Sequence, residues 1–138
     1  MQNKVLIDTG PFVAIFNQRD KFNDMCLEKF RKVPLPAYTT WAVVTELFWM
    51  IQSLPEAQKK FLELVKLGQI VILDLPTDSI GWLENFLEKY SDIKVQLADA
   101  SLMYFYEAGD GKFGNVFTLD VRDFSVFRVG RNRRVVLL

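Results

Sequence analysis

Short apolar runs alternate with helical patterns along the whole chain. The apolar runs cover residues 5–7, 37–39, 70–73, 116–118 and 135–137. Between them, apolar residues recur every three or four positions, as at Phe22, Cys26 and Phe30. Strands that are apolar throughout are typical of a parallel sheet covered on both faces. The pattern therefore predicts an α/β domain built around a mostly parallel five-stranded sheet.

Two of the predicted helices are apolar on nearly every side. They span about residues 41–52 and 95–107, and we expect them to be the innermost helices. Thr39 or Thr40 is placed to cap the first of them. The aromatic residues of these helices are expected to lie mainly in the core, with a surface groove for a partner protein as the alternative: Trp41, Phe48, Trp49, Phe105 and Tyr106.

Composition narrows the class of protein. The chain has 138 residues, half of them apolar, which suits a single domain spanning residues 1–138. Its 17 basic and 17 acidic residues cancel, which argues against a strongly basic coat for nucleic acids. No apolar run approaches the roughly 18 residues of a membrane span, and the first residues do not read as a signal peptide. A single cysteine, Cys26, allows no intrachain disulfide, so we expect a reduced, cytoplasmic setting without a membrane.

The chain contains no histidine. This excludes nucleophiles that histidine activates, and it excludes zinc or iron held by histidine. One cysteine is also too few for a zinc site made of thiolates. Polar chemistry must therefore rest on carboxylates, hydroxyls, lysine and arginine.

Four acidic residues interrupt otherwise apolar segments. Asp8 directly follows the first predicted strand and Asp120 the fourth, while Glu46 and Asp99 lie in the two apolar helices. All strands of a parallel sheet end at one edge, and the helices that follow them begin there. We therefore expect the four carboxylates to lie near that edge. Within three positions of Asp8, Glu46 and Asp99 there is no lysine or arginine, and Arg122 is the cation nearest Asp120.

Carboxylates that share a pocket repel one another, and a hard divalent cation removes that conflict. Mg²⁺ or Mn²⁺ also lowers the pKa of bound water and stabilises charge on a phosphoryl oxygen. In a chain without histidine, such a pocket points to phosphodiester hydrolysis. The alternatives are structural: Asp8, Asp99 and Asp120 can cap or stabilise helix starts, and Glu46 can extend its side chain to solvent.

The segments around these acids resemble those of PIN-domain ribonucleases, most closely the VapC-type toxins of prokaryotic toxin–antitoxin pairs. The matching segments are residues 5–11 (VLIDTGP), 40–49 (TWAVVTELFW), 97–102 (LADASL) and 118–124 (TLDVRDF). The resemblance implies a three-layer α/β/α sandwich. It places one or two Mg²⁺ or Mn²⁺ ions among four acids: Asp8, Glu46, Asp99 and Asp120. It also implies RNA cleavage, homodimers and inhibition by a cognate antitoxin.

Further positions follow the same resemblance. Asp123 matches an accessory acid of many members, and Thr9 and Thr118 match frequent hydroxyl positions. Gln96 departs from members that carry an additional acid nearby, so both one and two metal ions remain open.

Two other features carry weaker signals. The arginines near the C-terminus form a local basic cluster: Arg128, Arg131, Arg133 and Arg134. Arg122, Arg128 and Arg131 are candidates to contact the RNA backbone, and the alternatives are pairing of the cluster with an acidic partner and a solvated chain end. Residues 109–114 resemble a phosphate loop but lack its GK[ST] ending and precede a predicted strand, so we expect a turn.

Our hypothesis from the sequence is a metal-dependent endoribonuclease. Asp8, Asp99 and Asp120 would bind the metal directly or through water, and Glu46 would hold a water or a second ion. Water would attack the phosphorus in line and leave a 5′-phosphate and a 3′-hydroxyl. One alternative is a phosphatase with Asp8 as nucleophile, which needs Asp-x-Asp and a nearby lysine, and no lysine is obvious. The other is a PIN-like module that binds RNA or protein without cutting, which would be expected to lack one of the acids.

Overall fold

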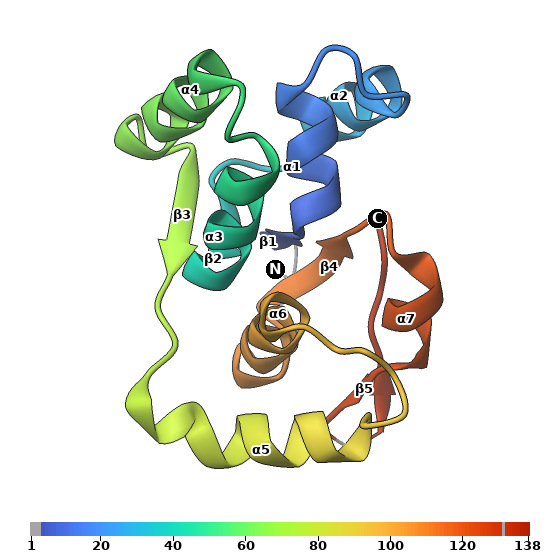
Figure 1. Ribbon diagram of the computed structural model, residues 1–138. Coiled ribbons are helices and arrows are strands. Elements are labelled where there is room, and N and C mark those ends of the chain that lie inside the picture. Colours follow the sequence, from blue (N-terminus) through green and yellow to red (C-terminus); the bar gives the residue numbers. More distant parts are fainter. Residues whose placement is uncertain (1–3, 131) are drawn as a thin grey trace.

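Four parallel strands form the centre of the computed structural model, which describes residues 4–130 and 132–138 (Figure 1). Their order across the sheet is β3-β2-β1-β4. The bounds are β1 (Lys4–Ile7), β2 (Ala37–Thr40), β3 (Ile70–Leu73) and β4 (Phe113–Phe117). Parallel neighbours require long return connections, and helices supply them here. The mixed α/β class and the parallel sheet that we predicted are confirmed.

Each connection between the parallel strands contains two α-helices. The helices are α1 (Thr9–Phe16), α2 (Asn23–Arg31), α3 (Trp41–Met50), α4 (Pro55–Lys66), α5 (Ile80–Lys89) and α6 (Leu97–Ala108). A 3₁₀ turn (Thr77–Ser79) precedes α5, and a short α7 (Val121–Val126) follows β4. Figure 1 shows these helices flanking the sheet, with α5 joined to β3 by an extended segment. In the described residues, no helix combines the length and apolar character needed to cross a membrane.

The predicted fifth strand is wrong. After β4 the chain forms an antiparallel pair of two-residue strands, β5 (Arg128–Val129) and β6 (Arg133–Arg134). Residues 135–137 then meet β4 only through a single parallel bridge between Leu137 and Val116. The Val116 amide donates to the Val136 carbonyl at 2.9 Å. This pairing covers too few residues to form a further strand of the sheet. Residues 109–112 form the expected turn.

Aromatic rings hold the helices of one half of the fold together. Phe61 of α4 meets Phe12 of α1 edge-on, with ring centroids 5.3 Å apart. It makes the same kind of contact with Phe16 and with Phe48, both at 5.8 Å. Edge-to-face pairs of this kind contribute about 0.5–1.5 kcal/mol each beyond burial. Phe61 is therefore the packing centre that joins α1, α3 and α4.

The two apolar helices differ in burial. Most of α6 is buried, as predicted, and Tyr106 lies in the core. In contrast, Trp41 and Trp49 of α3 are 50% and 70% exposed, so the prediction that they are core residues is wrong. Positions 41 and 49 are eight residues apart, a little over two helical turns, so they share one face of α3. The opposite side of α3, with Val43 and Leu47, supplies the buried contacts.

Candidate active site

The carboxyl ends of β1, β2 and β4 meet at one edge of the sheet. Ile7 is the register partner of Phe117, and the Asp8 amide extends that pairing by donating to the Phe117 carbonyl at 2.9 Å. The Thr39 hydroxyl donates to the Ile7 carbonyl at 2.8 Å and ties β2 to the same level. Asp8, which follows β1, therefore lies beside Thr118, which follows β4.

A buried pair of hydroxyls links the helices that carry the other two acids. Thr40 caps α3, as predicted, because its Oγ1 accepts from the Val43 amide at 3.3 Å. The same oxygen is 2.7 Å from Oγ of Ser101 on α6, and both residues are fully buried. This hydrogen bond fixes the start of α3 against the first turns of α6, so that Glu46 and Asp99 face the same edge of the sheet.

One cavity of about 430 Å³ opens at this edge, and we call it the carboxylate cavity. It is lined by Asp8, Thr9, Gly10, Glu46, Met50, Lys94, Gln96, Asp99, Leu119, Asp120 and Asp123. The four acids predicted from the sequence, together with Asp123, thus share one cavity. In the part of the chain that the structure describes, no three acidic side chains converge tightly enough to form a ready-made metal centre.

Asp8 is the most deeply buried of these acids, at 7% exposure. It occupies the N-cap position of α1, but its side chain makes no helix-capping hydrogen bond. The alternative that Asp8 serves as a helix cap is therefore not supported. Its Oδ2 instead accepts from the Thr118 hydroxyl at 2.8 Å. Burial raises the Asp8 pKa from 3.8 to about 6, the charges of Glu46 and Asp120 add to the rise, and hydrogen bonds from Thr9 and Thr118 oppose it.

Asp99 is the third residue of α6 and combines two roles. Its Oδ2 accepts from the Gln96 amide at 3.1 Å in a capping box, so the expected stabilisation of a helix start does occur. The carboxyl also lines the carboxylate cavity. Burial raises the Asp99 pKa from 3.8 to about 7, and repulsion from Asp8, Asp120 and Glu46 contributes. A capping role alone does not account for a carboxyl that the fold surrounds with other acids.

Asp120 and Asp123 lie at the start of α7. Asp120 is its N-cap and accepts from the Asp123 amide at 3.2 Å, as the structural alternative predicted. The pKa of Asp123 is raised by desolvation and by its neighbour Asp120, while Arg122 lowers it. Glu46 is half-buried, and among the described residues its carboxylate has no hydrogen-bond or salt-bridge partner.

The donor set of the cavity suits a hard divalent cation. All its candidate ligands are oxygens, which Mg²⁺ and Mn²⁺ prefer. The hydroxyl of Thr9 is buried at 3% exposure, lines the cavity and has no hydrogen-bond partner among the described residues. An unpartnered buried hydroxyl costs about 1–3 kcal/mol. A hydrated cation beside Asp8 would supply both the missing partner and the missing positive charge.

Lys94 also lines the carboxylate cavity, and the sequence reasoning missed it. It stands five positions before Asp99, outside the three positions on either side of that acid, which hold no lysine or arginine. The predicted arginines do not line the cavity in the described residues. Arg122 is exposed on α7, and Arg131 lies outside the described residues. One guanidinium nitrogen of Arg128 donates to three backbone carbonyls, of Ser125, Val126 and Phe127, at 2.8–3.0 Å.

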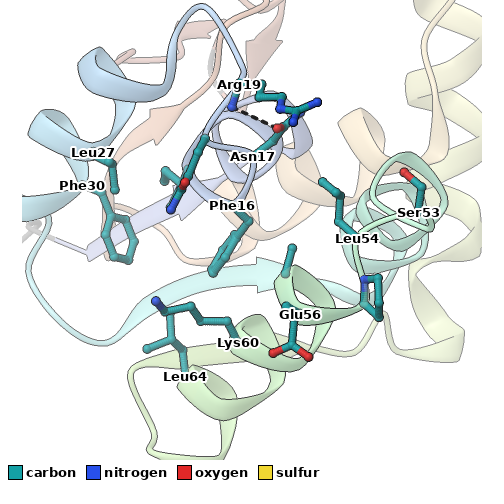
Figure 2. A pocket seen from close by; sticks show the side chains of 14 residues that line it. Phe16, Asn17, Arg19, Leu27, Phe30, Ser53, Leu54, Glu56, Lys60 and Leu64 are labelled. Atoms are coloured by element: carbon teal, nitrogen blue, oxygen red, sulfur yellow. Dashed lines mark hydrogen bonds between the residues drawn. The ribbon is translucent and has the colours of Figure 1, made fainter.

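A second, larger cavity of about 780 Å³ lies between the α1–α2 region and α4 (Figure 2). We call it the apolar cleft, because its walls carry Phe16, Leu27, Phe30, Leu54 and Leu64. Charged side chains also line it, namely Arg19, Glu56 and Lys60. It contains none of the acids that line the carboxylate cavity, so the two cavities are separate features of the fold.

Comparison with known proteins supports the fold. No family model matches the chain, and no curated protein matches it. Among solved structures, the chain is similar to VapC20 of Mycobacterium tuberculosis, described as a sarcin-ricin loop cleaving toxin. The TM-score is 0.72 at 15% sequence identity, over 86% of this chain and 92% of that chain. The PIN-like α/β fold expected from the sequence resemblance is therefore confirmed.

Proposed function

We propose that this chain is a metal-dependent endoribonuclease of the PIN type and acts as the toxin of a toxin–antitoxin pair. The observation that carries the proposal is the carboxylate cavity, where five acids from four separate segments line one space at the carboxyl edge of the sheet. Ligands of open α/β sheets bind at that edge. The shared fold with a cleaving toxin supports the same assignment.

Each residue of the cavity has a proposed role that follows from its position. Asp8, Asp99 and Asp120 would hold Mg²⁺ or Mn²⁺, Glu46 would hold a water or a second ion, and Asp123 would be a further ligand. When bound, the ion supplies an activated water and neutralises charge on the phosphoryl group. The Thr118 hydroxyl orients the Asp8 carboxylate through its 2.8 Å hydrogen bond. Cleavage leaves a 5′-phosphate and a 3′-hydroxyl on the RNA.

Two alternatives fit less well. The expectation that no lysine lies near the site is wrong, since Lys94 lines the cavity, and this removes one objection to a phosphatase. The other objection stands, because Gly10 occupies the position where a second aspartate would assist a nucleophilic Asp8. A module that only binds RNA would be expected to lack one of the acids, and all four predicted acids line the cavity.

A metal-dependence assay tests the proposal. Incubation with single-stranded RNA and Mn²⁺ should give cleaved products, and EDTA should stop the reaction, because the acids need a cation to activate water. Products are resolved on a denaturing gel, with a 5′-end analysis for the phosphate. Release of phosphate from a small ester, with RNA intact, would support the phosphatase. Shifted but intact RNA would support the binding module.

We also propose that the antitoxin docks in the apolar cleft of Figure 2. Its apolar walls fit an apolar segment, and Arg19 and Lys60 leave a net positive rim against the single acid Glu56. An antitoxin segment with apolar anchors and an acidic flank meets both features.

A matched pair of charge reversals tests that docking site. Lys60→Glu should weaken binding of the antitoxin, encoded by a neighbouring reading frame, by about tenfold, because a like charge then faces its acidic flank. Lys59→Glu reverses a neighbouring exposed lysine that does not line the cleft, and it should bind as the unchanged chain does. Binding is measured by calorimetry, and equal losses in the two variants would place the docking site elsewhere.

Homodimer formation and a cytoplasmic setting belong to the same proposal. The exposed face of α3, with Trp41 and Trp49, is apolar surface that a second copy would cover. A single buried cysteine, Cys26, is compatible with a reducing compartment.

A further inference from the structure

Lys94 is the one basic residue among the described residues that line the carboxylate cavity. It belongs to residues 91–96, the connection between α5 and α6, and its side chain is exposed. The single salt bridge in the described part of the chain joins Arg31 and Glu28. Lys94 therefore lines the same cavity as five acids and forms a salt bridge with none of them.

The backbone around Lys94 is held in place on both sides. The Ile93 amide donates to the Tyr90 carbonyl at 2.9 Å, and the Val95 amide donates to the Ile93 carbonyl at 2.9 Å. Ile93 and Val95 are half-buried and pack against the core. Next along the chain, the Gln96 amide is fixed by Asp99. Lys94 thus projects from a segment whose neighbouring residues are hydrogen-bonded and packed against the core.

An anionic substrate meets an electrostatic barrier at this cavity. Five carboxyl groups line it, whereas the basic side chains that the structure describes near the C-terminus do not. A divalent cation offsets only part of that negative charge, and an RNA strand adds one negative charge with every phosphate. A lysine ammonium is a compact point charge with three donors on a flexible stem, and it suits phosphate oxygens. Since Lys94 forms no salt bridge in the described part of the chain, its ammonium group is available to bind a ligand.

We propose that Lys94 binds a backbone phosphate of the RNA at the mouth of the carboxylate cavity and so holds the scissile bond over the acids. This inference rests on the proposed nuclease function and adds to it a residue that binds the substrate. The chain has zero net charge, so its overall charge does not attract RNA to an acidic site. The positive charge of Lys94 would supply that attraction locally.

Three variants of the full chain test the role of Lys94. Lys94→Ala should raise KM for a single-stranded RNA by about tenfold with little change in kcat, the loss expected for one hydrogen bond to a charged group. The slope of log(kcat/KM) against log salt should become shallower by about 0.7, as for one lost phosphate contact to a single strand. Lys94→Arg should restore most of the affinity. Lys112→Ala is the matched control. Lys112 is exposed and directly precedes β4, so it lies at the end of that strand opposite the carboxylate cavity.

The outcomes separate this inference from the function on which it rests. If the unchanged chain cleaves RNA but Lys94→Ala behaves as Lys112→Ala does, the role of Lys94 is overturned and the nuclease stands. A fall in kcat alone, with KM and the salt slope unchanged, also overturns the phosphate contact. If the unchanged chain leaves RNA intact with Mn²⁺ present, the proposed function fails and the inference fails with it.

Discussion

Asp8→Asn should lower the rate of RNA cleavage by more than about 100-fold. Mutation of a residue that only hydrogen-bonds to a metal ligand already lowers metal affinity or activity by about 10- to 100-fold. The asparagine keeps an oxygen that can accept the Thr118 hydroxyl, which donates to Asp8 at 2.8 Å. It carries no charge, so it is a poor ligand for a hard cation. The loss therefore reports on the carboxylate itself, and single-turnover cleavage of an RNA oligonucleotide measures it.

The same variant should be more stable than the unchanged chain when metal is removed at pH 8. The Asp8 pKa is raised from 3.8 to about 6, so keeping Asp8 ionised in the fold costs about 3 kcal/mol at 1.36 kcal/mol per pKa unit. Asparagine removes that cost. Urea unfolding in EDTA should show a higher midpoint, which is opposite to the usual effect of a substitution at a buried position.

Asp92→Asn is the control for both measurements, because Asp92 is exposed, lies in the same connection as Lys94 and does not line the cavity. It should leave both cleavage and stability unchanged. An Asp8→Asn variant that cleaves RNA normally would remove Asp8 from the site. An inactive variant that has also lost its circular dichroism spectrum would indicate a structural role, and Asp99→Asn would then decide whether the cavity is catalytic.

Mn²⁺ should raise the melting temperature of the unchanged chain by roughly 10 °C at a hundredfold excess over its dissociation constant. A ligand that binds only the folded state adds about 2.7 kcal/mol at that excess, and each kcal/mol shifts the midpoint of a domain this size by about 3–4 °C. The cation also relieves the repulsion among the acids of the cavity. Differential scanning fluorimetry with and without EDTA measures the shift, and no shift at millimolar Mn²⁺ would argue against a metal site.

The size of this shift should depend on pH. The pKa values of Asp8 and Asp99, about 6 and about 7, exceed their unfolded value of 3.8, so the folded state binds protons more tightly than the unfolded state. Their contribution to stability is fully present below about pH 4 and is lost as the pH rises through 6 to 7. Without metal, the melting temperature should fall over that range. With Mn²⁺ the gain should be small at pH 5, where protons compete, and large at pH 8.

The meeting of the acids could be predicted from the sequence because it follows from topology. Asp8 directly follows a buried strand, and Asp120 comes shortly after another, so parallel pairing alone brings them to one edge. Glu46 and Asp99 follow because they lie in the second turn of α3 and the first turn of α6, two helices that begin at that edge. The carboxylate cavity is thus a consequence of chain order and strand direction, both of which the apolar pattern encodes.

Other features depend on packing that no periodicity encodes. The exposed face of α3 was missed because Trp41 and Trp49 are apolar whether or not another surface covers them. The expected fifth strand has the right residues, but the β5–β6 pair before it leaves only Leu137 in register with Val116. Lys94 was missed because the turn after α5 brings it to the cavity, and that path depends on the burial of its neighbours Ile93 and Val95.

The hydrogen bond between Thr40 and Ser101 has a consequence for synthesis of the chain. The acids that line the carboxylate cavity are spread from Asp8 to Asp123, and the hydroxyl pair that sets two of their helices together spans residues 40–101. A ribosome must therefore produce nearly the whole polypeptide before the proposed catalytic centre can form. Prematurely terminated products should therefore lack the proposed nuclease activity.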